Sequence, residues 1–470
     1  MKKKILILIP TKLFYRNFIT TNAFEKIESE YECTFLIPSS LGVDFKNRKC
    51  IEYSFSNMQL MSYEFFSSVI LNNLLRTNIE KSLTFKYRVN RQKRGLDYLF
   101  FSIKKRPFRS FLRFLFYSLI TKPAQFFVDH ILPTKWFFSI FLNHLASKTE
   151  LSNQIHKFSG DLCIAPSSGA DSLLYLIIRS CNLSRTHIHL TIDNWDNLSS
   201  KTIFFEKPDS ISVWSKQAKN HAHLIQGIDE EHISIVGCSR YDYYFKYEKN
   251  NTPDNVVNGK YVIFLGTALN YNEEYFVNFS YEIIKELNRE LPEDKRVNLI
   301  YRPHPYRQIA PEKIYSGKGV NEEVIIDQEI NSKIVDKRNV LPDLNRQTIL
   351  LDHAEFVIGG LTSMLLESNI LFKKYIAIAI DDKTSMNTNM KDAFFSYEHF
   401  QGIESIDLID VCFSQEALKL SIINSINNNK NLTDIQKRKI DYSREYFIHK
   451  PSYSYKKSIF NAINKYVKQN

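Results

Sequence analysis

The sequence is poor in the features that mark secreted and membrane-spanning proteins. Its 470 residues include six cysteines, and no two of them form a C-x-x-C pair, so neither a zinc cluster nor a disulfide framework is indicated. Free thiols are typical of a reducing cytoplasm. The chain has no run of about 18 uncharged apolar residues, which a membrane-spanning helix would need. The apolar run at 5–10 is too short for a signal peptide, and no small-residue cleavage site follows it. We therefore expect a cytoplasmic protein.

Further absences narrow the possible functions. No internal repeat and no nucleic-acid recognition motif is visible, so we expect no nucleic-acid partner. No D-x-D pair follows a predicted strand, and the nearest arrangement, Asp193-Asn194-Trp195-Asp196, has a different spacing. We expect neither a metal ion nor a bound cofactor. Positive charge, in contrast, is in excess: the formal net charge of +11 calls for an anionic substrate or surface.

The order of apolar segments predicts an α/β fold. Strand-length apolar runs alternate with helix-length amphipathic segments, which is typical of parallel sheets. The chain begins with a strand at 4–10, a loop from Thr11 to Thr21, a helix from about Asn22 and a strand at 33–38. The pattern restarts near Gly160 and again at Tyr261. We expect an N-terminal domain at 1–245, a polar linker at 246–260, a second Rossmann-like domain at 261–440 and a closing helix at 441–470.

A segment of different character interrupts the first domain at about 57–150, where apolar residues recur at helical spacing. Between Lys86 and Arg113 it has ten basic residues against one acid, and aromatic residues interleave through 85–117. A basic, aromatic, helical segment can lie on an anionic membrane surface, which would place the protein at the inner face of the membrane. It can also be an insertion whose aromatics form core and whose cations are solvated. The sequence leaves both interpretations open.

The stretch at 355–371 is the clearest indication of a binding site, because it reads as a short strand, a diglycine turn and a helix start. Glycine permits close approach of a ligand to the backbone, and free amides at a helix start attract an anion. The Glu367 carboxylate, one turn deeper on the same face, would hold a ribose hydroxyl. An ordinary turn with a Ser/Thr cap would give the same pattern. The predicted phosphate site comprises Gly360, Leu361, Thr362 and Ser363.

A second segment, V-N-L-I-Y-R-P-H-P at 297–305, predicts a strand that ends at Arg302 and His304. Prolines on both sides of His304 keep it out of a helix. Ligands of open parallel sheets bind at the carboxyl ends of strands, so Arg302 and His304 are candidates for contacts with the same anion. The small-residue loop at Gly266 and Thr267, after a predicted strand at 261–265, can also approach a ligand.

The N-terminal half has one comparably polar strand end. A predicted strand at 187–192 is followed by D-N-W-D-N-L-S-S-K at 193–201. Asp193 or Asp196 could act as general base on a hydroxyl, with Asn194 and Trp195 beside them, and Lys201 could contact an anion. An Asx-turn with a helix cap would use the same residues. Arg16, in the first loop, would lie at this edge of the sheet as a cleft residue or a solvated cation.

Together, R-P-H-P at 302–305 and G-G-L-T-S-M-L-L-E at 359–367 resemble the donor half of GT-B glycosyltransferases that build bacterial surface polysaccharides such as capsule and O-antigen. The nearest patterns are the HP and S/T motifs of bacterial sialyltransferases, Kdo transferases and CDP-glycerol glycerophosphotransferases. The resemblance implies two Rossmann-like domains facing a cleft, with His304 near the donor phosphate and Thr362 and Ser363 binding it. V-G-C-S-R-Y-D at 236–242 is similar to the V-G-x-P-R-x-D segment of many GT-B chains, which implies that Arg240 lies near the cleft. In such folds the last helix often packs on the first domain.

The expected reaction is transfer of a sugar from a CMP- or UDP-linked donor to a lipid-linked or oligosaccharide acceptor. No E-x7-E motif is visible around 360–375, which favours inversion at the anomeric carbon. His304 would be the acid or electrophile at the bridging oxygen, and Asp193 or Asp196 the base on the acceptor. The alternatives are phosphoryl transfer, as in CDP-glycerol glycerophosphotransferases, and a UDP-sugar 2-epimerase of GT-B shape. A non-catalytic module that docks a polysaccharide assembly complex to a membrane is a further one.

Overall fold

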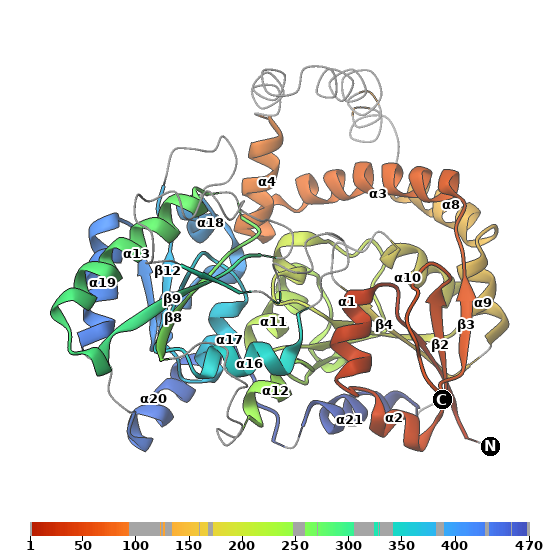
Figure 1. Cartoon of the computed structure of the whole chain (residues 1–470). Helices are drawn as coiled ribbons and strands as arrows, with labels where there is room; N and C mark the ends of the chain where they lie inside the picture. The colour runs from red at the N-terminus through yellow and green to blue at the C-terminus, as the bar shows by residue number, and fades with distance from the viewer. Residues whose placement is uncertain are drawn as a thin grey trace. The chain divides into compact units, whose positions relative to one another are not determined.

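The computed structural model comprises two compact units, each built on a parallel β-sheet (Figure 1). The first unit consists of Met1–Ser239, Tyr397–His399 and Pro451–Asn470, and the second of Arg240–Ser396 and Phe400–Lys450. The chain therefore leaves the first unit at Ser239, ahead of the predicted linker. The structure describes residues 2–93, 123, 126, 134–158, 160–167, 173–247, 259–269, 271–304, 324–327, 329, 342–381, 390–427, 432–452 and 454–467.

The first unit is organised by a seven-stranded sheet in which all neighbouring strands are parallel. Its strand order is β3-β2-β1-β4-β5-β6-β7. The chain starts near the centre, builds outward to β3 and continues on the other side of β1, so the order reverses between β1 and β4, where parallel sheets bind ligands. The strands are β1 (Lys4–Leu8), β2 (Glu32–Pro38), β3 (Cys50–Tyr53), β4 (Leu162–Ser167), β5 (His187–Ile192), β6 (Ser210–Val213) and β7 (Ile233–Ile235).

Helices connect these strands, and a helical insertion lies between β3 and β4, as predicted. Of the basic and aromatic segment predicted at 85–117, residues 85–93 are described, and there Phe85 and Val89 belong to the buried core; residues 94–117 lie outside the described part. The helices of the unit are α1 (Lys12–Phe14), α2 (Glu25–Glu30), α3 (Asn57–Thr77), α4 (Leu83–Lys93), α8 (Thr134–Ala146), α9 (Glu150–Phe158), α10 (Leu174–Leu183), α11 (Lys216–Asn220) and α21 (Tyr455–Val467).

The predicted loop after β1 is instead helical, with α1 followed by a π-helical turn at Tyr15–Thr20. The Thr11 hydroxyl accepts a hydrogen bond from the amide of Phe14, which caps the first turn. Phe14 and Phe18 enter the core. Because these two rings are buried, the segment has a fixed conformation at the carboxyl end of β1.

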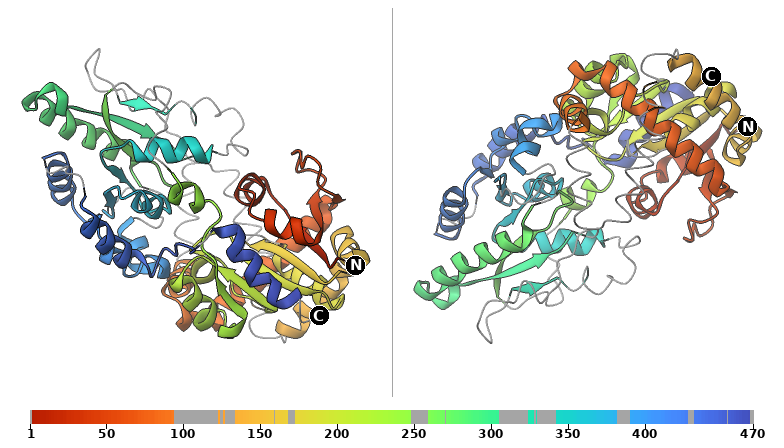
Figure 2. Two further views of the ribbon diagram at one scale, coloured as in Figure 1. Left: turned by 90° about the horizontal axis from the view of Figure 1, so that it is seen from below. Right: turned by 90° about the horizontal axis from the view of Figure 1, so that it is seen from above.

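The last helix of the chain, α21, is part of the first unit's core. Its Ile459 and Ile463 are fully buried in the same cluster as Ile5 of β1 and Ile164 of β4. Figure 2 shows this helix, in blue, along the strands of the first sheet. The helix begins at Tyr455, and the preceding α20 (Asp434–Arg444) belongs to the second unit.

The second unit has a six-stranded parallel sheet in the order β10-β9-β8-β11-β12-β13. Here the order reverses between β8 and β11. The strands are β8 (Lys260–Leu265), β9 (Val297–Arg302), β10 (Ile325–Ile326), β11 (Val357–Gly359), β12 (Tyr375–Ile378) and β13 (Ile409–Cys412). The helices are α12 (Tyr241–Phe245), α13 (Glu273–Glu290), α16 (Leu344–Asp352), α17 (Met364–Ile370), α18 (Met390–Ser396), α19 (Gln415–Asn427) and α20.

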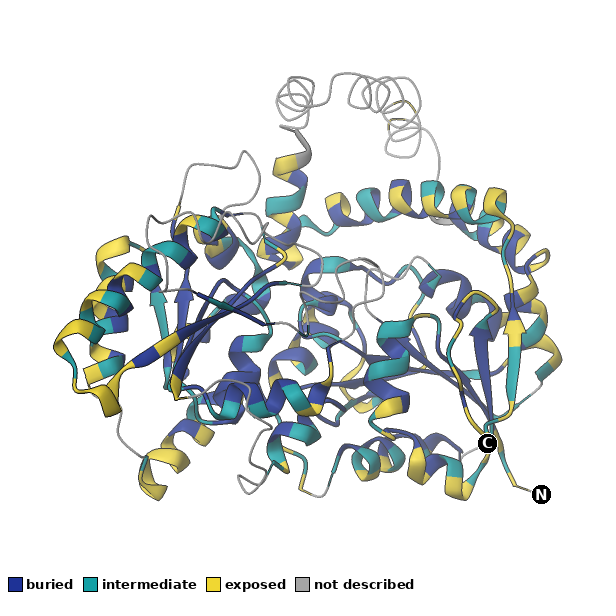
Figure 3. Cartoon of the chain, viewed as in Figure 1, coloured by how far each residue is buried: buried dark blue, intermediate teal, exposed yellow. Residues whose placement is uncertain are grey.

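The predicted fold class is confirmed: the chain is α/β, with two Rossmann-like units and a helical insertion in the first. Figure 3 shows that the strands are largely buried and that exposed residues gather on the helices. Among the described residues, no helix combines the length and the apolar character that crossing a bilayer requires.

Candidate functional site

Three neighbouring strands of the second sheet end at the same edge and bring the predicted donor residues together. β8 lies between β9 and β11. Gly266 follows β8, and Gly360 follows β11. Arg302 is the last residue of β9, and His304 lies two residues after it. All three strands run parallel, so their carboxyl ends lie side by side, where open α/β sheets bind ligands.

Gly266 lies directly against the backbone that carries His304. A Cβ atom at this position would come 2.6 Å from the His304 amide nitrogen and 3.2 Å from the Pro303 carbonyl carbon. The Gly266 amide donates a hydrogen bond of 2.9 Å to the carbonyl of Arg302. The loop after β9 can therefore approach β8 this closely only because residue 266 has no side chain.

The next residue, Thr267, joins the same place to the turn after β11. Its hydroxyl donates a hydrogen bond of 3.1 Å to the carbonyl of Leu361, and a Cβ at Gly360 would lie 2.6 Å from the Thr267 methyl carbon. Consecutive residues, Gly266 and Thr267, thus contact the His304 backbone on one side and the diglycine turn on the other. Because adjacent Cα atoms are about 3.8 Å apart, the two predicted motifs lie close together.

Thr362 and Ser363 stand between this turn and α17, and both are half-buried. Ser363 occupies the N-cap position of α17, but its side chain makes no capping hydrogen bond. The cap of this helix therefore does not explain the serine, although caps are the common reason for serine at such a position.

The buried carboxylate of Glu273, at the start of α13, holds the loop that contains Thr267. It accepts hydrogen bonds from the Thr267 amide, at 3.2 Å, and from the Tyr301 hydroxyl. Glu273 was not predicted as a site residue, because an acid in the first turn of a helix is usually an exposed partner of the helix dipole.

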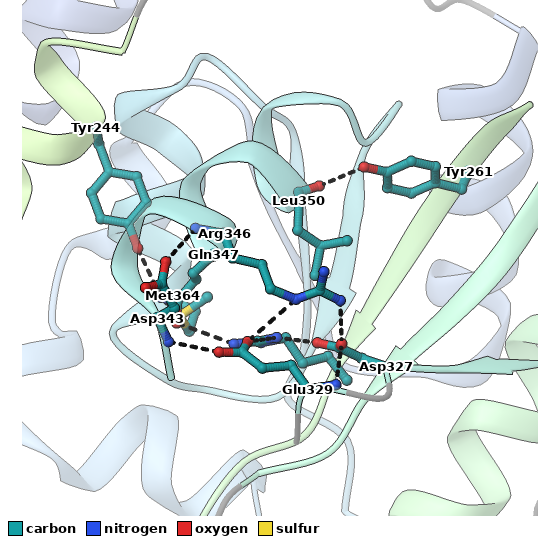
Figure 4. A network of polar contacts seen from close by, with 10 residues as sticks. Tyr244, Tyr261, Asp327, Glu329, Asp343, Arg346, Gln347, Leu350 and Met364 are labelled. Carbon is teal, nitrogen blue, oxygen red and sulfur yellow. Dashed lines mark hydrogen bonds and ion pairs between the residues drawn. The ribbon is translucent and has the colours of Figure 1, made fainter. Parts of the chain in front are cut away.

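Glu367, predicted to hold a ribose hydroxyl, is paired with other side chains of the protein. Its carboxylate pairs with Arg240 at 3.3 Å and accepts hydrogen bonds of 2.7 Å from the Tyr244 hydroxyl and from the Gln347 amide. Glu367 and Arg240 are both buried. Figure 4 shows Tyr244 and Gln347 in this network, together with Met364 of α17. The network joins α12, α16 and α17 within the second unit.

Arg302 is likewise held by acids. Its guanidinium contacts Asp327 and, at 3.1 Å, Glu329. Arg346 approaches the same two carboxylates, at 2.9 and 3.6 Å, as Figure 4 shows. Burial raises the pKa of Asp327, but the charge of Arg302 and the hydrogen bond from Arg346 outweigh it, and the net pKa lies below the ordinary value. Arg302 is therefore part of a charge cluster that anchors the end of β9.

In the first unit, Arg16 and Asp193 are connected through Asn17. The Arg16 Nε donates a hydrogen bond of 2.9 Å to the side-chain oxygen of Asn17, and the Asn17 amide donates one of 2.6 Å to an oxygen of Asp193. Asn17 and Asp193 are both buried. They come from the carboxyl ends of β1 and β5, on either side of β4, so the structure joins two predicted residues of this edge.

The remaining residues of 193–201 lie in a turn and a π-helical segment, Asn197–Lys201. Asp196 pairs with Lys201 at 3.0 Å. Trp195 is buried with its ring at 4.9 Å, edge to face, from the ring of His399. Asn194, which precedes Trp195, is half-buried.

His399 was not predicted, since it is about two hundred residues away in sequence and has no motif around it. It belongs to the three-residue segment that returns to the first unit, and its Nδ1 lies 3.1 Å from the Ser200 hydroxyl. Burial lowers the pKa of His399 to about 4. The same cause lowers the pKa of His221 and of His189 to about 3. These histidines are neutral parts of the core at neutral pH.

Among the described residues, no group of three or more His, Cys, Asp or Glu side chains is arranged to hold a metal ion.

The fold of this chain resembles that of solved structures, although its sequence matches no known family. No protein-family model matches the chain, and no curated protein matches it in sequence. Solved structures do match. One is a candidate UDP-N-acetylglucosamine 2-epimerase from Listeria monocytogenes, with a TM-score of 0.55 at 12% identity, covering 100% of this chain and 98% of that one. Another is the UDP-GlcNAc 2-epimerase of Neisseria meningitidis bound to UDP-GlcNAc, with a TM-score of 0.51 at 9% identity, covering 98% and 100%.

The likeness to the lipopolysaccharide outer core galactosyltransferase WaaB is weaker, with a TM-score of 0.41 at 12% identity over 98% of this chain and 99% of that one. The fold is therefore the GT-B fold of two Rossmann-like domains, as in the two UDP-N-acetylglucosamine 2-epimerase structures above. At these identities the likeness concerns the fold alone, because one fold serves many chemistries.

Proposed function

We propose that this chain is an enzyme that transfers a sugar from a nucleotide-activated donor to an acceptor hydroxyl. The observation that supports this most is the contact of Gly266 and Thr267 with the loops of His304 and Leu361. Bare backbone and small hydroxyls at adjacent ends of parallel strands suit the diphosphate of a nucleotide.

In this proposal Thr362 and Ser363, with the amides of Gly360 and Leu361, hold the donor phosphates. His304 stabilises the negative charge that develops on the departing phosphate oxygen. The buried pairs of Arg302 and Glu367 act indirectly, by fixing the end of β9 and the position of α17. The proposal requires no metal ion and no cofactor.

On the acceptor side, Asp193 is the first candidate for the base and Asp196 the second. Asp193 is oriented by Asn17, whereas Asp196 is paired with Lys201. The base takes the proton of the acceptor hydroxyl as its oxygen bonds to the anomeric carbon, and the electrons of the broken bond leave with the donor phosphate. The acceptor class is a lipid-linked or oligosaccharide glycan of bacterial surface polysaccharide synthesis, at the inner face of the membrane.

A UDP-sugar 2-epimerase is the second candidate function. It is favoured because two solved structures with TM-scores above 0.5 bear that description. It would use the same phosphate site, so nucleotide binding alone does not separate the two functions.

The donor site is tested by calorimetry with UDP, CMP, CDP, GDP and TDP. We expect one of them to bind selectively, and the T362A/S363A variant to bind it about 10-fold to 100-fold more weakly, because hydrogen bonds to charged groups contribute about 1.5–3 kcal/mol. S405A, at an exposed serine of the same unit, is the matched control. Unchanged binding by T362A/S363A would refute the proposed phosphate site.

Incubation of the purified protein in D2O with a UDP-sugar, without acceptor, separates the two reactions. Epimerisation at C2 breaks and remakes a C–H bond, so its product gains deuterium at C2. Glycosyl transfer leaves C2 untouched and releases the nucleotide only when an acceptor is present. Acceptor-independent deuterium incorporation would favour the epimerase.

A further inference from the structure

The positive charge of this protein is concentrated in one segment of its sequence. Residues 57–150 contain fifteen Lys and Arg against five Asp and Glu, a net charge of +10 out of the +11 of the whole chain. The rest of the molecule is therefore close to neutral. A charge this localised indicates one strongly anionic partner rather than general solubility.

Two helices of the same insertion expose large apolar side chains. On α3, Met58 is 76% and Met61 70% exposed, and on α8 Trp136 is 61% exposed, with Ile140 also exposed. Met58 and Met61 are three residues apart, and Trp136 and Ile140 four, so each pair shares one face of its helix. Surface helices normally carry polar residues on such faces.

The two helices form one surface. Phe66 of α3 packs its ring 4.4 Å from that of Phe141 and 6.0 Å from that of Phe137 on α8. At the other end, the Gln59 amide donates a hydrogen bond of 3.3 Å to the carbonyl of Lys148, just after α8. The helices are thus antiparallel neighbours, as Figure 1 shows. The core of the unit uses other residues of α3, such as Val69 and Ile70.

We propose that the exposed face of α3 and α8 binds an anionic lipid bilayer. Met58, Met61, Trp136 and Ile140 enter the boundary between headgroups and acyl chains, as the apolar face of an interfacial helix does. Exposed cations of the insertion, among them Lys81, Lys86 and Lys148, attract the anionic headgroups, and each cation near such a surface raises binding about five-fold.

The charge of the insertion favours an anionic bilayer over a second copy of the chain as the partner of this face. Pairing this face with itself would bring the exposed cations of two copies, such as Lys81, Lys86 and Lys148, together, and like charges at an interface oppose association. An anionic bilayer neutralises the same charge. Tryptophan also favours the boundary between lipid and water. This inference does not depend on the proposed reaction.

The chain carries its own reporter for the test. Trp195 and Trp214 are buried, and Trp136 is the exposed one of the three tryptophans. The intact protein is mixed with vesicles of phosphatidylcholine, with or without phosphatidylglycerol. We expect tryptophan emission to shift to shorter wavelength with phosphatidylglycerol only, the shift to be absent in W136F, and binding to weaken in 1 M salt, where the Debye length is about 3 Å.

Sedimentation with the same vesicles gives the effect of the apolar residues. The M58E/M61E variant should bind vesicles about 10-fold or more weakly, because it removes apolar area and adds repulsion by the headgroups. I435E is the matched control, since Ile435 is a highly exposed isoleucine of α20 in the second unit, and it should bind like the wild type.

Quenching of wild-type emission by brominated lipids tests the inference without any substitution. Absence of quenching, vesicle binding that M58E/M61E leaves unchanged, or equal binding to neutral and anionic vesicles would each overturn it. Light scattering that shows a dimer abolished by M58E/M61E would assign the face to a second copy instead.

Discussion

Replacing Glu367 by glutamine tests whether its carboxylate stabilises the fold or binds the ribose of a nucleotide. The side chains of Glu367 and Arg240 are 3% and 8% exposed, and they form an ion pair at 3.3 Å. Glutamine keeps the shape of the side chain but removes the charge. The guanidinium of Arg240 is then left buried without its carboxylate, and one hydrogen of the new amide faces Tyr244 or Gln347, which both donate to this position.

The expected loss of stability follows from that arrangement. Removing one partner of a buried ion pair costs about 3–5 kcal/mol, because the other charge stays in a medium of low polarity. For a unit of this size, each kcal/mol lowers the melting temperature by about 2–4 °C. E367Q should therefore melt about 6–20 °C below the wild type in the transition of the second unit.

Circular dichroism against temperature and urea, for both transitions, measures this loss. E416Q, at an exposed acid in the first turn of α19, is the control and should change stability by less than about 1 kcal/mol. The R240M/E367Q variant should be less destabilised than the sum of the two single variants, since it leaves no isolated buried charge. At temperatures well below melting, E367Q should bind the nucleotide within about three-fold of the wild type. A stability loss below about 1 kcal/mol, combined with nucleotide binding weakened more than about 10-fold, would refute the structural role.

Three further outcomes are expected. G266A forces a Cβ to within 2.6 Å of the His304 amide nitrogen; we expect a loss of about 1–3 kcal/mol of stability and, since a displacement of about 1 Å can cost about 100-fold in rate, a fall in turnover that exceeds the fall in nucleotide affinity. N17D places a second carboxylate against Asp193, so the pH at which activity rises should move upward, while N17A should lower activity without that movement. The pKa of His189 is about 3 in the folded protein against an ordinary 6.5. Between these two values the unfolded chain binds one proton more than the folded protein, so the free energy of unfolding falls by about 1.4 kcal/mol per pH unit as the pH decreases from about 6.5. H189Q should reduce this slope in urea titrations, and an unchanged slope would contradict the reasoning.

The fold was predictable because its strands are local features. β5 appears at the predicted residues 187–192, and β2 differs by one residue from the predicted strand, since short apolar runs bounded by polar residues define interior parallel strands by themselves. The loop after β1 was predicted wrongly because Phe14 and Phe18 are two aromatics in a polar segment. Only their burial in the core reveals the helical turns.

The sequence predicts where the candidate site residues lie in the fold, but not which side chains they pair with. That Gly266, His304 and Gly360 share one edge follows from the rule that parallel strands end together. Arg302 looks the same in a sequence whether it faces a ligand or Asp327, because the acid lies just after the next strand, 25 residues later. Glu367 and Arg240 are separated by 127 residues. Long-range pairs of this kind leave no periodic trace.

The position of α21 has a consequence for how the protein is made. Residues 1–239 leave the ribosome long before Ile459 and Ile463, which complete their core. Until residues Tyr455–Val467 are synthesised, the apolar side of β1 and β4 that this helix covers is open, and exposed apolar strands are where nascent chains aggregate. We expect the nascent first unit to need chaperone protection throughout synthesis of the second, and ribosome-bound chains stalled before Tyr455 to be sensitive to protease.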